Sequence, residues 1–198
     1  MLKRIEICGG IAAGKTTLVQ ILAENGFSPI YENFEDNPFL SQFYQNNALD
    51  NTFETEMACV LLHYSGIKQR QGESIWVSDY ALVQDYSYGM QNLKPAPKEV
   101  FDHFYGYLCE TLVPANMIIY LKCSAECLLE RIQERNRNME SSITKGYLQK
   151  HIEILEYNLR NEKRLCIIDS ERFDFREKDK GEVLEMIRKE MARHEMHI

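Results

Sequence analysis

The sequence predicts an α/β fold in which helices cover both faces of a parallel sheet. Apolar, strand-like runs recur along the chain, and a polar or helical stretch follows each of them. Alternation of this kind over one domain is typical of a parallel sheet. The pattern G-x-x-x-x-G-K-T agrees, because it lies between the first apolar run and a helical stretch. The predicted strands are residues 2–8, 29–31, 75–78, 117–121 and 165–168.

Length and composition narrow the class of protein. A chain of 198 residues with 44% hydrophobic composition can bury one core, so we expect a single domain over residues 1–198. The formal net charge of -7 argues against a surface that binds long nucleic acid, although a local basic site can still hold a phosphate. The chain shows neither a signal-peptide pattern nor an apolar run of membrane-spanning length, so we expect no membrane partner and a cytoplasmic location.

The cysteines are scattered, mostly inside apolar runs, and show no paired C-x-x-C spacing. Thiols of this kind are typical of the reduced core of a cytosolic protein. The five histidines show no paired spacing either, so the sequence predicts no zinc-type cluster. The cysteines are Cys8, Cys59, Cys109, Cys123, Cys127 and Cys166.

The glycine-rich motif predicts a phosphate-binding loop. Its small residues leave backbone N–H groups free to wrap a polyphosphate at the N-terminus of a helix. Lys15 adds a cation near the β- and γ-phosphates, and the Thr16 hydroxyl is a ligand for Mg²⁺. The alternative is a turn of small residues that packs a helix onto the sheet. The predicted nucleotide-binding residues of the loop are Gly9, Gly10, Ile11, Ala12, Ala13, Gly14, Lys15, Thr16 and Thr17.

Helices follow from capping residues and from apolar spacing. The pair Asn37-Pro38 is typical of an N-cap and the first turn of a helix. Apolar residues at helical spacing predict helices over residues 53–67 and 98–112, and we interpret the aromatic stripe of the second as core or subunit interface. Ser124 and Thr144 are each predicted to cap a later helix.

Two carboxylates directly follow predicted strands, at the edge where ligands of open parallel sheets bind. Glu32 follows the second strand and is a candidate base that accepts a proton from an attacking hydroxyl; the alternative is a loop carboxylate in water. Asp79 follows the third strand and is a candidate ligand of Mg²⁺; the alternative is a helix N-cap.

Three arginines precede a polar linker at residues 136–143. Arg131 and Arg135 are four residues apart on a predicted helix, and Arg137 follows. This arrangement suits a lid whose guanidinium groups close on phosphoryl oxygens in the transition state. The alternative is a solvated basic face paired with the neighbouring glutamates at positions 130 and 134.

With these features, the chain resembles the deoxynucleoside kinase family from the glycine-rich loop nearly to the C-terminus. Residues 31–34 (Y-E-N-F), followed by D-N-P-F-L at 36–40 and by Phe43-Tyr44, are similar to a family segment whose glutamate is the base for the 5′-hydroxyl. Residues 127–137 and Glu140 look like the R-I-x-x-R-x-R lid and its trailing glutamate. Residues 166–175 are similar to the last strand and the loop that covers the adenine of ATP.

The resemblance implies a P-loop kinase fold with a lid, a five-stranded sheet of order 2-3-1-4-5, and a homodimer formed through a helical bundle. It implies ATP as phosphate donor, Mg²⁺ held by Thr16 and Asp79, and a small-molecule deoxynucleoside as acceptor. The catalytic residues are then Glu32, Lys15, Asp79, Arg131, Arg135 and Arg137, with further ATP contacts from Asp174 and Phe175. Contacts to the acceptor are expected from Glu32, Tyr44, Glu56, His63, Tyr80, Asp85 and Glu140.

The departures from the family fall on the acceptor side. The family has an acid, an arginine and a serine after the third strand, where this chain has Asp79-Tyr80-Ala81. The family's base-reading glutamine aligns with Glu56, and an arginine seven residues later aligns with His63. An ionised Glu56 would only accept hydrogen bonds and would favour guanine, which presents N1–H and its 2-amino group together, over thymine. His63 would be a weaker counter-charge for Asp85 or Glu56; alternatively, Glu56 points away from the base.

Three hypotheses of function follow. The first is transfer of a phosphoryl group from ATP to the 5′-hydroxyl of a deoxynucleoside, with Glu32 as base. The second keeps the transfer and changes the acceptor to a nucleoside monophosphate or another alcohol, as the changed acceptor side allows. The third is a nucleotide-binding regulatory protein with little catalysis, against which the retained acids and lid arginines argue.

Overall fold

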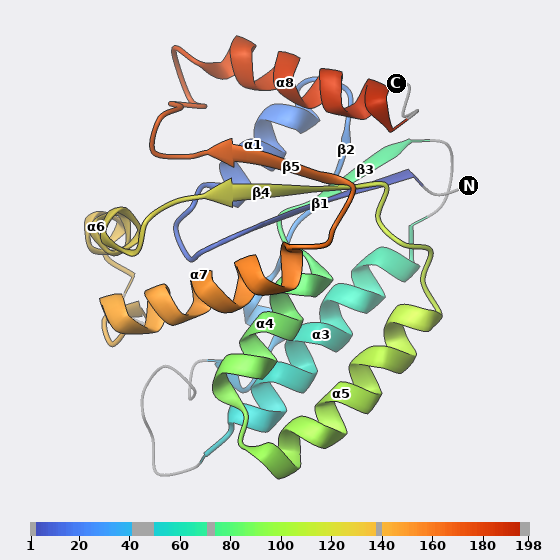
Figure 1. The fold of residues 1–198 in the computed structure, drawn as a ribbon, viewed down its shortest axis with the longest axis vertical. Coiled ribbons are helices and arrows are strands. Elements are labelled where there is room, and N and C mark those ends of the chain that lie inside the picture. Colours follow the sequence, from blue (N-terminus) through green and yellow to red (C-terminus); the bar gives the residue numbers. More distant parts are fainter. Residues whose placement is uncertain (1–2, 41–49, 71–73, 138–139, 195–198) are drawn as a thin grey trace.

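A computed structural model describes residues 3–40, 50–70, 74–137 and 140–194. Five parallel strands form one sheet in the order β2-β3-β1-β4-β5, which confirms the order implied by the family resemblance (Figure 1). Each predicted strand is present, with its bounds shifted by one residue at most. The strands are β1 (Lys3–Gly9), β2 (Ser28–Ile30), β3 (Ile75–Ser78), β4 (Met117–Lys122) and β5 (Leu165–Asp169).

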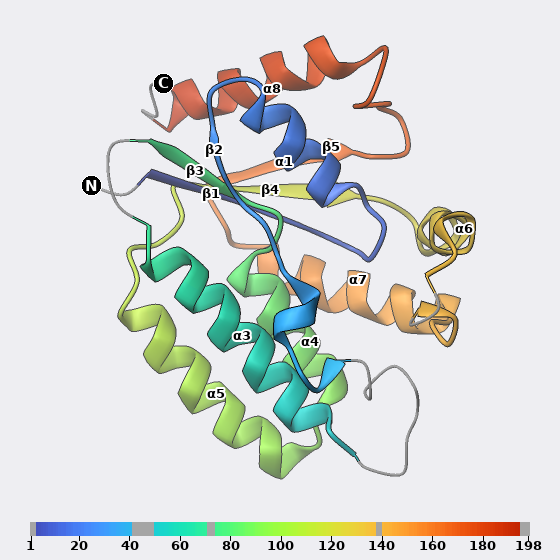
Figure 2. The same ribbon diagram turned by 180° about the vertical axis from the view of Figure 1, so that it is seen from behind.

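Helices cover both faces of the sheet, as the sequence predicted. Figures 1 and 2 show α1 and α8 on one face and α3, α4, α5 and α7 on the other, with α6 beyond the carboxyl end of β4. The helices are α1 (Lys15–Ala23), α3 (Thr52–Lys68), α4 (Leu82–Asn92), α5 (Pro95–Glu110), α6 (Ala125–Arg135), α7 (Lys145–Leu159) and α8 (Lys180–Arg193), and a 3-10 turn, η1, covers Phe34–Asp36. The part of the chain described here contains no helix long and apolar enough to cross a membrane.

The central strands are buried on both sides, which is why they appear in the sequence as continuous apolar runs. On β1, Ile5 and Ile7 pack in the cluster that contains the apolar residues of α1 and α8. On β4, Ile118 and Tyr120 face the opposite way and pack with Leu155 of α7. Alternate residues of the strands therefore hold the two helical layers to the sheet.

The capping residues predicted from the sequence mostly hold their helices. The Ser124 hydroxyl accepts the Cys127 N–H at 3.3 Å, and the Thr144 hydroxyl accepts the Tyr147 N–H at 3.2 Å. Asn37 Oδ1 accepts the Phe39 N–H at 3.1 Å, but the helix predicted from this position lies mostly outside the described residues. The helix predicted from residue 98 begins earlier, at Pro95, whose fixed backbone angle suits a first turn.

The crossing of α4 and α5 depends on a glycine. Gly89 of α4 has no side chain, and the ring of Phe101 of α5 fills the space, since a Cβ on Gly89 would lie 2.3 Å from its Cε1. Phe101 is fully buried. The two helices can therefore approach closely only with glycine at this position.

We expect Gly89→Ala to lower the free energy of unfolding by about 1–3 kcal/mol, because the methyl group overpacks a filled core. Urea unfolding followed by circular dichroism measures this difference. Gly181→Ala is the matched control, since Gly181 is exposed in α8 with no neighbouring atom within 4 Å, and should change little. An equal effect of both substitutions would contradict the packing argument.

Candidate active site

A cavity of about 780 Å³ lies at the carboxyl edge of the sheet, where the sequence placed the ligand site. The predicted site residues from Ile11 to Thr17 line it, as do the candidate base, the lid arginines and the acceptor-side acids. Gly9 and Gly10 do not line the cavity. Tyr44 lies outside the described residues. One cavity thus holds both the predicted donor side and the predicted acceptor side.

The glycine-rich loop runs from the end of β1 into α1, with its lysine at the first helical position. Gly9 and Gly14 have φ angles of 148° and 99°, which an L side chain rarely adopts, and a Cβ on Gly9 would lie 2.8 Å from the Leu121 carbonyl oxygen. Lys15 Nζ donates to the carbonyl oxygens of Gly9 at 2.9 Å and Gly10 at 3.2 Å. Burial lowers the pKa of Lys15, while the charges of Glu32 and Asp79 oppose that shift. The cation is held inside the loop where a polyphosphate would be wrapped.

Asp79 ties the loop to the neighbouring strand ends. Its Oδ2 accepts the Thr16 hydroxyl at 2.7 Å, and its Oδ1 accepts the Glu32 backbone N–H at 2.7 Å. The alternative that Asp79 caps a helix is wrong, because the N-cap of α4 is Ala81. Burial raises the pKa of Asp79, while the two hydrogen bonds oppose the rise. The carboxylate and the hydroxyl predicted to bind Mg²⁺ therefore lie side by side.

Glu32 lies at the exit of β2 and turns into the cavity rather than into water. Its side chain is 19% exposed, and its Oε1 lies 3.2 Å from His63 Nε2. His63 Nδ1 lies 2.8 Å from Asp85 Oδ2. The alternative of a solvated loop carboxylate is therefore wrong. His63 is the counter-charge of Asp85, as the sequence allowed, but its second partner is Glu32 and not Glu56.

Glu56 is buried on α3, and its ionisation differs from the sequence expectation. Its Oε1 accepts a hydrogen bond from Asn92 Nδ2 at 2.7 Å, and the same amide lies 3.2 Å from Tyr147 Oη. Burial raises the pKa of Glu56 to about 8; the hydrogen bond from Asn92 opposes this shift, and the charge of Asp85 adds to it. The assumption that Glu56 is ionised at neutral pH is therefore corrected, since a pKa of about 8 leaves the acid mostly protonated there.

Tyr80 occupies the position at which the family has an arginine. Its ring stacks on the His63 ring with 3.9 Å between centroids, and its hydroxyl donates to the His63 carbonyl oxygen at 3.3 Å. Tyr80 lines the cavity but is 3% exposed. Its role in this structure is to support His63.

The lid arginines all reach the cavity, and each has a protein partner. Arg131 donates to the carbonyl oxygen of Ser170 at 2.6 Å. Arg135 makes a two-point contact with the Glu140 carboxylate, with Nε 2.7 Å from Oε2, and Arg137 lies 3.7 Å from the same group. The alternative that these arginines pair with the glutamates at positions 130 and 134 is not what the structure shows.

The loop after β5 closes the donor end of the cavity. A Cβ on Gly14 would lie 3.3 Å from the Phe175 ring, so this ring packs directly on the glycine-rich loop. The Asp174 N–H donates to Asp179 at 2.8 Å, and Asp174 Oδ1 accepts the Arg176 N–H at 3.1 Å. The two residues predicted to contact ATP are thus placed beside the phosphate-binding loop.

Sequence reasoning missed several residues that shape the site. Asn92 and Tyr147 contact the Glu56 side of the cavity, and Gln84 Oε1 accepts the Gly9 N–H at 2.8 Å. Asn92 lies seven residues after Asp85, on the same face of α4, and this spacing was a usable signal. Nothing in the sequence pointed to Tyr147, which is brought in by the packing of α7.

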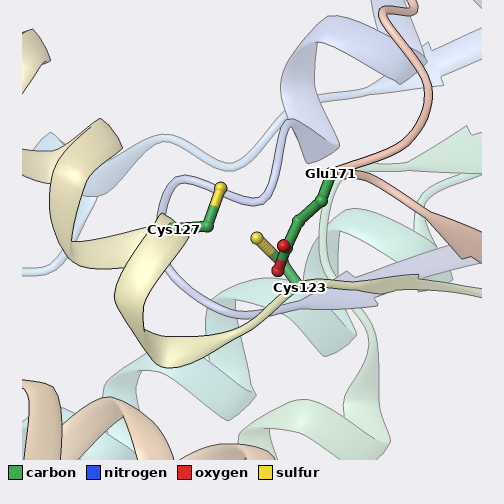
Figure 3. Close-up of side chains that lie close together, drawn as sticks. All are labelled: Cys123, Cys127 and Glu171. Atoms are coloured by element: carbon green, nitrogen blue, oxygen red, sulfur yellow. The ribbon is translucent and has the colours of Figure 1, made fainter.

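A cysteine pair and a glutamate meet near the lid, although the sequence predicted no zinc-type cluster. Figure 3 shows Cys123 after β4, Cys127 on α6 and Glu171 on the loop after β5, and their potential ligand atoms lie within 4.8 Å of one another. Burial raises the pKa of Cys123 to about 12, so this thiol is protonated at neutral pH. The fold, rather than sequence spacing, creates this group.

The sequence and fold of the chain were compared with those of known proteins, and the matches are consistent with a phosphate-binding site in this cavity. The family profile described as "Deoxynucleoside kinase" matches residues 5–192. The chain belongs to the deoxynucleoside kinase family. It is therefore a phosphotransferase that acts on a deoxynucleoside, which confirms the reaction class of the first hypothesis. The role of Glu32 as base stays a prediction.

Individual relatives agree with this assignment. The chain is similar to a deoxyguanosine kinase of Bacillus subtilis (strain 168), with 34% identity over 155 residues, 75% of this chain and 74% of the relative. It is also similar to a deoxyadenosine kinase of Lactobacillus acidophilus, with 27% identity over 192 residues, 88% of this chain and 89% of the relative. The solved deoxyadenosine kinase of M. mycoides has the same fold, with a TM-score of 0.79 at 20% identity, covering 93% of this chain and 98% of that one.

We expect Lys15→Ala to lower kcat by about 100- to 1,000-fold, because it removes the cation of the phosphate-binding loop from the developing negative charge. Steady-state kinetics with ATP and deoxynucleosides measure this loss. Lys122→Ala is the matched control, since Lys122 is exposed on β4 and does not line the cavity. Near-normal turnover of Lys15→Ala would contradict the role of the loop.

Proposed function

We propose that the enzyme transfers the γ-phosphoryl group of ATP to the 5′-hydroxyl of a deoxynucleoside, with Glu32 as general base. The observation that supports this role is the position of Glu32, whose carboxylate lies in the same cavity as Lys15 of the phosphate-binding loop. Its backbone is fixed by Asp79 and its side chain by His63. A base in this position can act on an acceptor that faces the γ-phosphate.

In the proposed reaction, Glu32 takes the proton of the 5′-hydroxyl as the 5′-oxygen forms a bond to the γ-phosphorus. The bond between that phosphorus and the β,γ-bridging oxygen breaks, and ADP leaves. Lys15 and the loop N–H groups stabilise the charge on the donor phosphates. Asp174 and Phe175 are proposed to cover the adenine end of ATP, beside the loop.

Thr16 and Asp79 would hold Mg²⁺. Their oxygens are 2.7 Å apart, and a hydroxyl beside a carboxylate is a donor set that Mg²⁺ accepts next to phosphates. When bound, the ion would supply positive charge that offsets the negative charge of the phosphates. Thr16 and Asp79 therefore have a second role besides tying the loop to β3.

Arg131, Arg135 and Arg137 are proposed to stabilise the transferring phosphoryl group. In the proposed closed form, Arg135 leaves Glu140 and binds phosphoryl oxygens instead. Its planar guanidinium group can contact two of these oxygens at once. Glu140 is buried and lines the cavity, so it is available for the acceptor once Arg135 has moved.

The whole chain is proposed to act as one domain in a homodimer formed through its helical layer. Exposed apolar residues on two adjacent helices support this assembly. They are Leu61 of α3, 49% exposed, and Val100 and Tyr107 of α5, 55% and 64% exposed. Val100 and Tyr107 are seven residues apart and share one face of α5.

Glu32→Gln should lower kcat by about 100- to 10,000-fold with little change in the KM for ATP, because the amide keeps the size but cannot take the proton. Steady-state kinetics with both substrates varied separate the two constants. Glu35→Gln is the matched control, since Glu35 is exposed on the turn that follows. If Glu32→Gln raised only the KM for the deoxynucleoside, Glu32 would be a binding residue and not the base.

The acceptor base is proposed to be a purine, with guanine ahead of thymine. Glu56 lies at the acceptor end, where Asp85, Cys59 and Tyr147 also line the cavity. When ionised, its carboxylate accepts hydrogen bonds from N1–H and the 2-amino group of guanine together. When protonated, it can donate to a thymine carbonyl and accept from N3–H. The choice of base is therefore linked to the ionisation of Glu56.

The ratio of kcat/KM for deoxyguanosine to that for thymidine should accordingly rise between about pH 7 and about pH 8.5, because the pKa of Glu56 is raised to about 8 and the acid ionises over this range. Competition assays across this range give the ratio directly. Glu56→Gln should remove the pH dependence of the ratio. A flat ratio in the wild-type enzyme, or an unchanged slope in the variant, would exclude Glu56 from base reading.

A further inference from the structure

His63 connects the proposed base to a second buried carboxylate. It lies on α3, its side chain is 7% exposed, and it has an acid at each ring nitrogen. Nδ1 is 2.8 Å and 3.0 Å from the two oxygens of Asp85, and Nε2 is 3.2 Å from Glu32 Oε1. An imidazole that donates from both nitrogens is the protonated form. The geometry is thus that of a cation between two carboxylates.

The environment of His63 favours that form. Burial alone lowers the pKa of His63, but Asp85 and Glu32 together raise it to about 10. Asp85 is itself buried, which raises its pKa, and the imidazolium opposes that rise. Tyr80, two residues after the end of β3, faces the ring; burial raises its pKa, so it faces His63 as a neutral phenol. Two acids and one neutral ring therefore surround the imidazole.

The orientation of the imidazole is fixed by packing as well as by charge. The Tyr80 ring stacks on it with an interplanar angle of 6°, and the Tyr80 hydroxyl donates to the His63 carbonyl oxygen. Gly66 makes room for this arrangement, since a Cβ there would lie 2.6 Å from the Tyr80 hydroxyl. A ring held on its face and at both nitrogens has little freedom to rotate away from Glu32.

We propose that His63 is a positioning residue for the phosphoryl transfer: its Nε2–H holds Oε1 of Glu32, so that Oε2 faces the 5′-hydroxyl. This inference rests on the proposed role of Glu32 as base. Asp85 and Tyr80 act through His63: Asp85 favours the doubly protonated ring, and Tyr80 fixes its plane. The competing explanation is that His63 only neutralises buried Asp85 and has no part in turnover.

Two substitutions separate these explanations, because each keeps one of the two contacts. The amide nitrogen of Asn lies near the position of Nδ1, so His63→Asn keeps the donor to Asp85 and loses the donor to Glu32. The amide nitrogen of Gln lies near the position of Nε2, so His63→Gln keeps the donor to Glu32 and loses the donor to Asp85. We expect kcat to fall about 100-fold in His63→Asn and about 10-fold in His63→Gln, with the KM for ATP unchanged in both.

His194 provides the matched control. It directly follows α8, on the opposite side of the sheet from α5, and does not line the cavity. His194→Asn and His194→Gln should leave kcat unchanged. If the kcat of His63→Asn equalled or exceeded that of His63→Gln, the inference would be overturned. The remaining explanation would be that His63 only neutralises Asp85.

A double-mutant cycle tests whether His63 acts through Glu32. In a Glu32→Gln background, His63→Asn should cost less than about threefold, because the base it positions is already absent. Full additivity of the two losses would contradict the inference. If Glu32→Gln by itself left kcat intact, the proposed role of Glu32 as base would be wrong. If Glu32→Gln lowered kcat but His63→Asn lowered it no more than His63→Gln, only the proposed role of His63 would be wrong.

One measurement needs no substitution at His63 and so does not depend on the folding of its variants. In ¹⁵N-labelled wild-type enzyme, the His63 ring should show two protonated nitrogens at neutral pH. The Nε2 signal should shift in Glu32→Gln while the Nδ1 signal shifts less. A His63 ring protonated on one nitrogen only, or an Nε2 signal unaffected by Glu32→Gln, would overturn the inference.

Discussion

The site depends first on the carboxylate of Asp79, which joins three strand ends that are distant in sequence. One oxygen accepts the Thr16 hydroxyl after β1, and the other accepts the Glu32 N–H after β2, while Asp79 itself follows β3. Because β3 lies between β1 and β2 in the sheet, a single carboxylate reaches both neighbours. The distance between the phosphate-binding loop and the proposed base is therefore fixed by the sheet.

The cavity brings several buried acids close to two cations. The ionisation state of each acid and each cation depends on the charged group nearest to it. Lys15 lies beside the acids of the donor side, and His63 lies between two acids of the acceptor side. Glu56 has an amide as its hydrogen-bond donor, and its pKa is raised to about 8. The donor end thus has a cation that can bind a polyanion, whereas the acceptor end has groups that can donate or accept a proton.

Much of this could be predicted from the sequence, because local patterns determine it. The alternating apolar runs predicted helices on both faces of a sheet, and the motif before α1 predicted the phosphate-binding loop. The positions directly after strands identified Glu32 and Asp79 as site residues. The strand order came from resemblance to a family, whereas the lid was predicted from the three arginines before the polar linker and agreed with that resemblance. The contacts of His63 with Glu32, the stacking of Tyr80 and the approach of Tyr147 to Asn92 could not be predicted, because they depend on how helices distant in sequence pack. The protonation of Glu56 depends on burial in the folded chain, which no residue spacing reports.

In the proposed lid, the two-point contact between Arg135 and Glu140 would favour strongly charged ligands. A guanidinium that already holds a carboxylate exchanges one anion for another when phosphate arrives, so a weak or singly charged anion gains little by displacing Glu140. A polyphosphate, with more negative charge concentrated at the glycine-rich loop, gains more. In the proposed lid, Glu140 would therefore compete with the ligand for Arg135, and a small or weakly charged anion would not displace it.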